Sequence, residues 1–153
     1  MTVPLPPLPR IPFVGSLLAL LCSSTLVGQT PVDTAATVAA AEQAAQDWLA
    51  IVDRGDIAKS WDEGALVFQI AVTREKWVQA VKSARGPFEP FGARRRIMAR
   101  YTTEPPNAPP GKYVILQYST NVSGGRQVVE TVVPVLDGKR GWRVSGYWVR
   151  LDK

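Results

Sequence analysis

Apolar residues recur every three or four positions between Asp33 and Arg54, a segment that contains no glycine and no proline. This period is typical of one buried face of an amphipathic helix. Asp33 or Thr34 can cap the start of this helix, and Gly55 directly follows its last turn as a stop signal. The apolar stripe of the predicted helix consists of Val38, Ala41, Ala45, Trp48 and Val52.

Two shorter helices are predicted before residue 86, with an ambiguous segment between them. Asp56 can cap a helix over 57–63, and Thr73 can cap another over 74–85, because both residue types accept hydrogen bonds from the free backbone N–H groups of a first turn. The intervening segment, 65–72, is apolar but too short for its period to be decisive, and it predicts a short strand or a loop.

From residue 93 onward the hydrophobic period changes to two, which is typical of strands. Segments rich in Gly and Pro separate four such runs, and Pro134 inside the third indicates a bulge or an edge position. The predicted strands cover residues 94–102, 113–122, 127–136 and 142–151. This order predicts an α+β domain in which N-terminal helices pack on one face of a four-stranded, curved antiparallel sheet.

The first 28 residues have the order of a secretory signal peptide, with one base (Arg10), an apolar centre over 17–21 and small residues up to Gly28. The apolar stretch is shorter than the ~20 residues of a comfortable membrane span, although an uncleaved anchor remains the alternative. Cys22 follows a leucine, whereas a lipid-acceptor cysteine normally follows a small residue. We therefore expect a signal peptide over 1–28, one domain over 29–153, and a periplasmic or secreted protein.

The amino-acid composition excludes several kinds of catalytic, disulfide and metal-binding sites. The 153 residues include 18 Lys and Arg, 13 Asp and Glu, one Cys and no His, giving a net charge of +5. Without histidine there is no serine triad of the usual kind, and one cysteine cannot form a disulfide or a zinc cluster within the chain. No acidic cluster has the spacing of a metal site, and no Gly-rich phosphate loop is present, so we expect no metal and no cofactor.

Short motifs recur in an order that resembles a known family. They are Trp48-Leu49, Asp53-Arg-Gly-Asp56, Ser60-Trp61-Asp62, Arg74-Glu-Lys-Trp77, Arg85-Gly-Pro87, Tyr113-Val-Ile-Leu116, Glu130-Thr131 and the ending Trp142-Arg-Val-Ser-Gly-Tyr147. Over about residues 40–150 the chain resembles the bacterial family catalogued as domain of unknown function 4019, whose members usually follow a signal peptide. The resemblance implies an exported domain and supplies no catalytic residues. The element order is also similar to the nuclear-transport-factor-like and cystatin-like folds.

Three residues are candidates for acid–base chemistry. Asp62 follows Trp61, and a carboxylate beside a buried indole can have a raised pKa and act as a general base. Glu130 lies on the same strand face as Val128, where a buried acid needs a partner such as Arg143, Arg126 or a tyrosine hydroxyl. Tyr147 can donate a hydrogen bond to such an acid, as in isomerase-like sites. The alternative for each of these residues is a purely structural role, namely helix capping, ion pairing or burial.

The candidate binding residues are aromatic or basic. Trp61, Tyr118 and Tyr147 can line a cavity, whereas Arg94, Arg96 and Arg100 alternate along one predicted strand face and can contact an anionic lipid or an acidic partner. Aromatic residues do not alternate with these arginines as base stacking would require, so no nucleic-acid partner is expected. Membrane contact is expected only through an uncleaved signal or a weak interaction with anionic lipid.

Two functions from different classes remain. The first is a non-enzymatic exported module that binds a small apolar ligand or an envelope protein. Because the last two strands are apolar on both faces, the second sheet face is then a ligand cavity or a homodimer interface. The alternative is a small isomerase-like or hydratase-like enzyme that uses an acid with a tyrosine. The enzyme requires Asp62 or Glu130 to open into a concave apolar pocket without pairing to arginine.

Overall fold

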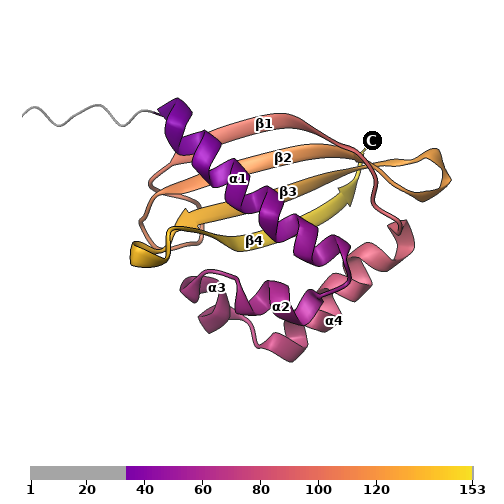
Figure 1. Ribbon diagram of the computed structural model, residues 1–153, viewed down its shortest axis with the longest axis horizontal. Helices are drawn as coiled ribbons and strands as arrows, with labels where there is room; N and C mark the ends of the chain where they lie inside the picture. The colour runs from indigo at the N-terminus through magenta and orange to yellow at the C-terminus, as the bar shows by residue number, and fades with distance from the viewer. Residues whose placement is uncertain (1–33, 153) are drawn as a thin grey trace, which may run out of the picture. The chain divides into compact units, whose positions relative to one another are not determined.

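The computed structural model describes residues 34–152, in which four helices precede four strands (Figure 1). The predicted signal peptide, Cys22 and the cap residue Asp33 lie outside the described residues. The helices are α1 (Thr34–Asp53), α2 (Ile57–Asp62), α3 (Leu66–Ala71) and α4 (Arg74–Arg85). The strands are β1 (Arg94–Thr102), β2 (Tyr113–Asn121), β3 (Gln127–Leu136) and β4 (Trp142–Leu151). The predicted α+β class, with helices packed on the sheet, is confirmed.

The helix signals in the sequence act largely as predicted. Gly55 takes a φ of +84° directly after α1, a conformation that residues with a Cβ rarely adopt. The Thr73 hydroxyl accepts a hydrogen bond from the backbone N–H of Lys76 at 3.3 Å and so caps α4. Asp56 occupies the N-cap position of α2, but its side chain makes no cap bond and instead pairs with Arg54 at 3.6 Å.

The strand-or-loop prediction for 65–72 is wrong, because this segment forms the six-residue helix α3. The backbone N–H of Ala65 donates to the carbonyl of Val144 at 2.8 Å, so the segment joins the edge of β4 through one residue and then turns into a helix. The helical turn places Ala65 and Phe68, three residues apart, on the buried side. Ile70 is apolar but exposed, so the apolar residues of this segment do not mark its buried side and show neither a helical nor an alternating period.

The sheet is an antiparallel meander with strand order β1-β2-β3-β4, and α1 lies across it (Figure 1). We call the face that packs against α1 the inner face and the opposite one the outer face. Each of two ladders contains a register shift, one in β1 between Arg96 and Met98 and one between β3 and β4 at Pro134. A bulge reverses which residues point inward, so a shift of one residue exchanges the two faces of the strand.

The bulge in β1 corrects the predicted arginine face. Arg94 and Arg96 pair with Thr120 and Tyr118, which point inward. After the bulge Arg100 pairs with Ile115 on the outer face. The three arginines therefore do not share one face, because strict alternation was assumed across a strand that contains one extra residue.

The core forms where α1, α2, α3 and α4 meet the inner face. Trp48 and Trp77 lie 5.9 Å apart between ring centroids, and Trp48 lies 5.5 Å from Tyr147 of β4. Both indole N–H groups bond to Ser60, one to its carbonyl at 2.8 Å and one to its hydroxyl at 2.9 Å. Each large apolar side chain buried here contributes roughly 1.5–3 kcal/mol. Ser60 satisfies the polar ends of both tryptophans and thereby fixes α2 against α1 and α4.

Candidate functional site

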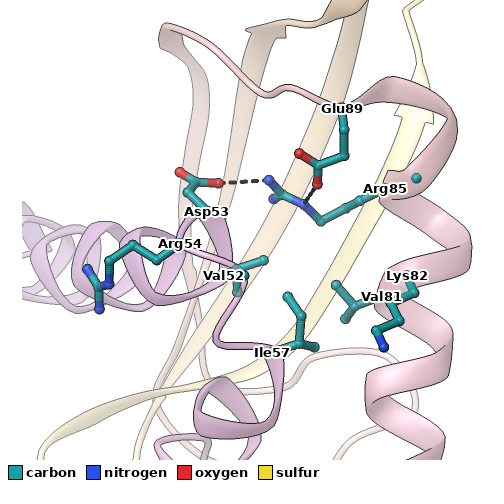
Figure 2. A pocket seen from close by; sticks show the side chains of 10 residues that line it. Val52, Asp53, Arg54, Ile57, Val81, Lys82, Arg85 and Glu89 are labelled. Atoms are coloured by element: carbon teal, nitrogen blue, oxygen red, sulfur yellow. Dashed lines mark hydrogen bonds and ion pairs between the residues drawn. The ribbon is translucent and has the colours of Figure 1, made fainter.

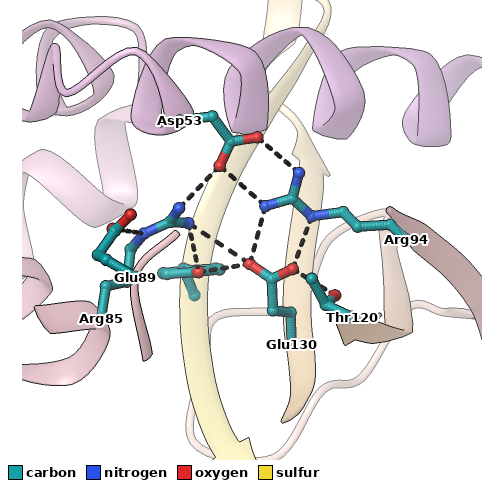
Figure 3. A network of polar contacts seen from close by, with 7 residues as sticks. Asp53, Arg85, Glu89, Arg94, Thr120 and Glu130 are labelled. Atoms are coloured by element: carbon teal, nitrogen blue, oxygen red, sulfur yellow. Dashed lines mark hydrogen bonds and ion pairs between the residues drawn. The ribbon is translucent and has the colours of Figure 1, made fainter. Parts of the chain in front are cut away.

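A buried carboxylate, Glu130, lies at the centre of a network of polar side chains under α1 (Figure 3). Its Oε2 accepts hydrogen bonds from Arg94 Nε and from Thr120 Oγ1, each at 2.6 Å. Its Oε1 accepts from Tyr147 Oη at 2.6 Å and from Arg94 Nη2 at 3.1 Å, and it lies 3.5 Å from Arg85 Nη1. Both carboxylate oxygens are therefore fully occupied by donors from the protein.

Asp53 at the end of α1 extends the network toward solvent. It accepts from Arg94 Nη1 at 2.6 Å and from Arg85 Nη2 at 2.8 Å, so both arginines bridge it to Glu130. Arg85 also donates to Tyr147 Oη at 3.0 Å and to Glu89 at 3.0 Å, while its guanidinium stacks 3.7 Å from the centroid of Phe91. The network thus joins α1, α4 and all four strands.

The charges at the centre of the network balance. The two acids Asp53 and Glu130 face two arginines, so these four side chains carry no net charge. Glu89, which is half exposed and pairs with Arg85, adds one negative charge at the edge of the network. Burial alone would raise the pKa of Asp53, but its bonds to Arg94 and the attraction of both arginines outweigh burial and hold that pKa below its ordinary value. Burial, followed by the nearby charge of Glu130, raises the pKa of Tyr147 far above its ordinary value, so its hydroxyl remains a donor.

These contacts decide what the network can do chemically. A general base needs a free lone pair within reach of a substrate proton, and Glu130 has none available. Asp62 is exposed and pairs with Arg74 through both carboxylate oxygens, at 3.1 and 2.9 Å. Because both candidate acids pair with arginine, the condition that the sequence set for an acid–tyrosine enzyme is not met by these residues.

A pocket of about 460 Å³ borders the network between the end of α1 and α4 (Figure 2). Asp53, Arg85 and Glu89 form its polar wall, where Arg85 donates to both carboxylates. Val52, Ile57 and Val81 form its apolar side. The polar groups of this wall are already paired within the protein, which leaves the ammonium group of Lys82 as an exposed donor that borders the pocket.

A second pocket of about 460 Å³, which we call the loop pocket, is of a different kind. The outer sheet face forms its floor, α3 forms one wall, and the proline-rich loop between β1 and β2 forms another. Tyr113 Oη donates to the carbonyl of Pro109 at 3.0 Å and so fixes this loop to the sheet. The loop pocket is lined by Val67, Phe68, Ala71, Pro105, Pro106, Asn107, Ala108, Pro109, Tyr113, Ile115, Thr131, Val133, Ser145 and Trp148.

Trp148 separates the loop pocket from a groove of about 430 Å³ between α4 and β4. Its side chain is 60% exposed, whereas Trp48 and Trp77 are buried. Gly146 makes this position possible, since a Cβ there would lie 2.3 Å from Cη2 of Trp148. The indole ring of Trp148 therefore lies over the backbone of Gly146, between the loop pocket and the α4–β4 groove.

Three further predicted site residues, Trp61, Arg96 and Tyr118, lie outside the loop pocket. Trp61 donates from Nε1 to the carbonyl of Val72 at 2.8 Å. Arg96 pairs with Glu42 of α1. Tyr118 is buried on the inner face with no hydrogen-bond partner for its hydroxyl, and burial, with the charge of Glu42 next, raises its pKa to about 12. Neither Trp61 nor Tyr118 lines the loop pocket.

The partners proposed for Glu130 from sequence were partly wrong. The tyrosine hydroxyl is correct, but Arg143 pairs with Glu63 at 2.7 Å, and Arg126 donates to the carbonyls of Ser123 and Pro87. Arg85 and Asp53 were missed as members of the network. Arg85 follows an apolar stripe in α4 and resembles an ordinary cationic helix end, so only the fold shows that it points inward.

Two possible functions gain no support within residues 34–152. No group of three or more acidic, cysteine or histidine side chains there is placed to hold a metal ion. None of the helices in this range combines the length and the hydrophobicity needed to span a bilayer.

The fold and the two sites define an α+β domain with a buried ion-pair network under α1 and an apolar pocket on the outer face of the sheet. The family described as Protein of unknown function (DUF4019) matches residues 44–147, and the chain belongs to this family. The match includes every charged member of the network from Asp53 to Glu130. No curated protein matches the chain.

Proposed function

We propose that this protein is a non-catalytic binding module that takes up a small apolar ligand in the loop pocket. The observation that carries this proposal is the concentration of Phe68, Tyr113 and Trp148 around a hollow of about 460 Å³. Ligand pockets of proteins are typically ~300–1,000 Å³, mostly apolar, and fitted with a few polar groups. Here the polar groups are supplied by Thr131 and Ser145.

The chemistry of the site supports binding rather than turnover. The hydroxyl of Ser145 donates to the carbonyl of Val133 at 2.8 Å, and Thr131 accepts from Gln117 at 3.3 Å. No ionisable acid lines the loop pocket, so it lacks a residue that could transfer a proton at neutral pH. An apolar ligand would gain affinity by removing the exposed ring of Trp148 from water.

We further propose that the module acts outside the cytosol. The support is the order of residues 1–28, in which one base, an apolar centre and small residues follow one another as in a signal peptide. Intact mass of the protein recovered from the extracytoplasmic fraction of expressing cells tests this point. We expect the loss of about the first 28 residues, whereas an unprocessed chain confined to the cytosol would contradict it.

A fluorescent apolar probe tests the binding site. N-phenyl-1-naphthylamine is neutral and brightens when it leaves water, so its titration reports occupancy of an apolar pocket. Ala71 is an exposed residue at the end of α3 that lines the loop pocket. We expect Ala71→Phe to fill the pocket and to weaken binding at least tenfold, which corresponds to about 1.4 kcal/mol.

Ala80→Phe is the matched control, because Ala80 is also an exposed helical residue but lines the α4–β4 groove. It should leave the affinity for the probe within about twofold. The proposal fails if no saturable binding occurs or if both variants weaken binding equally. Loss of binding in Ala80→Phe alone would assign the site to the groove instead.

A further inference from the structure

The outer face of the sheet is strongly asymmetric in charge. Glu130 is the only acid in any of the four strands, and it points inward. Strand pairing places two rows across the outer face, one from Arg95 to Arg150 and one from Met98 to Trp148. The first row is Arg95–Ser119–Val129–Arg150 and the second is Met98–Gln117–Thr131–Trp148.

Three arginines on this face are free to bind an external anion. Arg95 and Arg150 stand at the two ends of the first row, and Arg100 pairs with Ile115 further along β1. All three are exposed, and none has an ion pair or a side-chain hydrogen bond with any residue of 34–152. The inward-facing Arg94 and Arg96, by contrast, are both paired with carboxylates.

The spacing suits a broad anionic surface better than a single small anion. Three strand spacings of roughly 4.8 Å separate Arg95 from Arg150, which gives about 14 Å across the sheet. Trp148 lies in the next row, 60% exposed and raised over Gly146. Indole rings favour the boundary between water and lipid, because one edge is polar and the body of the ring is apolar.

We propose that this basic face, formed by Arg95, Arg100, Arg150 and Trp148, docks on an anionic lipid bilayer. The choice of occupant rests on charge complementarity, since the face offers unpaired cations and an interfacial aromatic ring with no acid among its strand residues. A second copy of this chain would oppose arginine to arginine, which is unfavourable. The inference is independent of the loop pocket, although Trp148 borders both sites.

Sedimentation with lipid vesicles tests the proposal on the protein as the expressing cell produces it. Vesicles of phosphatidylcholine with 30% phosphatidylglycerol are compared with pure phosphatidylcholine vesicles, at low salt and in 0.5 M NaCl. Each arginine near an anionic surface contributes about fivefold in partitioning, so Arg95→Gln/Arg100→Gln/Arg150→Gln should lower it roughly a hundredfold. High salt should abolish most of the wild-type preference for anionic vesicles.

The matched control is Lys59→Gln/Lys76→Gln/Lys82→Gln, which removes the same charge from exposed lysines of α2 and α4. It should change partitioning by no more than about twofold. The variant Arg95→Lys/Arg100→Lys/Arg150→Lys keeps the charge and should retain binding, which guards against a folding defect in the glutamine variant. Vesicles should also shift the tryptophan emission to shorter wavelength, and Trp148→Phe should remove that shift.

Several results would overturn the proposal. Equal losses in the arginine and lysine variants would show that only net charge matters. Equal binding to neutral and anionic vesicles would show that another segment is responsible. Absence of vesicle binding, together with association to an acidic protein or dimerisation through the same arginines, would assign the face to a protein partner.

Discussion

Removal of the Glu130 carboxylate is the sharpest test of the buried network. In Glu130→Ala, Arg94 loses two hydrogen bonds, and the hydroxyls of Thr120 and Tyr147 lose their shared acceptor. Arg85, of which only 2% is exposed, also loses a neighbouring negative charge. Breaking a buried ion pair by removing one partner costs about 3–5 kcal/mol, and domains are typically stable by about 5–15 kcal/mol.

We therefore expect Glu130→Ala to lower the free energy of unfolding by about 4 kcal/mol and the melting temperature by about 15 °C. Urea denaturation followed by both circular dichroism and tryptophan fluorescence measures the loss, with coincident curves showing two-state behaviour. Glu130→Gln keeps the shape and one acceptor oxygen but loses the charge, so its cost should be intermediate.

Asp62→Ala is the control, because Asp62 forms an ion pair with Arg74 that is about half exposed on both sides. Such surface pairs contribute little to stability. If Glu130→Ala costs no more than Asp62→Ala, the network does not hold the helices to the sheet, and the reasoning about its saturated carboxylate is wrong.

Three further predictions follow from single contacts. Burial would raise the pKa of Asp53, but two arginines hold that pKa below its ordinary value. The stabilisation that ionised Asp53 contributes is therefore present above about pH 4 and is lost as the pH falls through the folded-state pKa. Between about pH 5 and pH 3 the urea midpoint should drop more in the wild type than in Asp53→Asn. Tyr147→Phe should lower the free energy of unfolding by about 1–3 kcal/mol in chemical denaturation, because Arg85 and Glu130 each lose a hydrogen bond. Tyr118→Phe should leave that free energy unchanged or raise it, since the Tyr118 hydroxyl has no hydrogen-bond partner. Equal losses in the two variants would contradict this prediction. Gly146→Ala should displace the ring of Trp148, because the new Cβ would lie 2.3 Å from that ring. We expect weaker binding of N-phenyl-1-naphthylamine with little change in melting temperature. An unchanged affinity for this probe would count against the loop pocket as its binding site.

The sequence predicts the order and type of most elements because their signals are local. The three- and four-residue period of α1, the Thr73 cap and the stop signal at Gly55 all act within a few residues. The segment that becomes α3 is the exception, since six residues are too few to show a period and the position of the segment depends on a backbone bond to Val144.

The site residues are less predictable because they depend on register and on contacts between distant segments. One bulge in β1 places Arg100 on the outer face, away from Arg94, and no residue type in that stretch indicates a bulge. Glu130 and Tyr147 could be singled out as a polar pair on apolar strands, but Arg85 lies 45 residues before Glu130 and reaches it only through the docking of α4.

Assigned indole N–H resonances give the most direct test of the central claim, because the five tryptophans report five different places in the fold. Titration with N-phenyl-1-naphthylamine should shift the Trp148 signal and leave those of Trp48 and Trp77, both bonded to Ser60, essentially unchanged. Shifts at Trp48 and Trp77, or none at Trp148 under saturating binding, would contradict a ligand site on the outer face of the sheet.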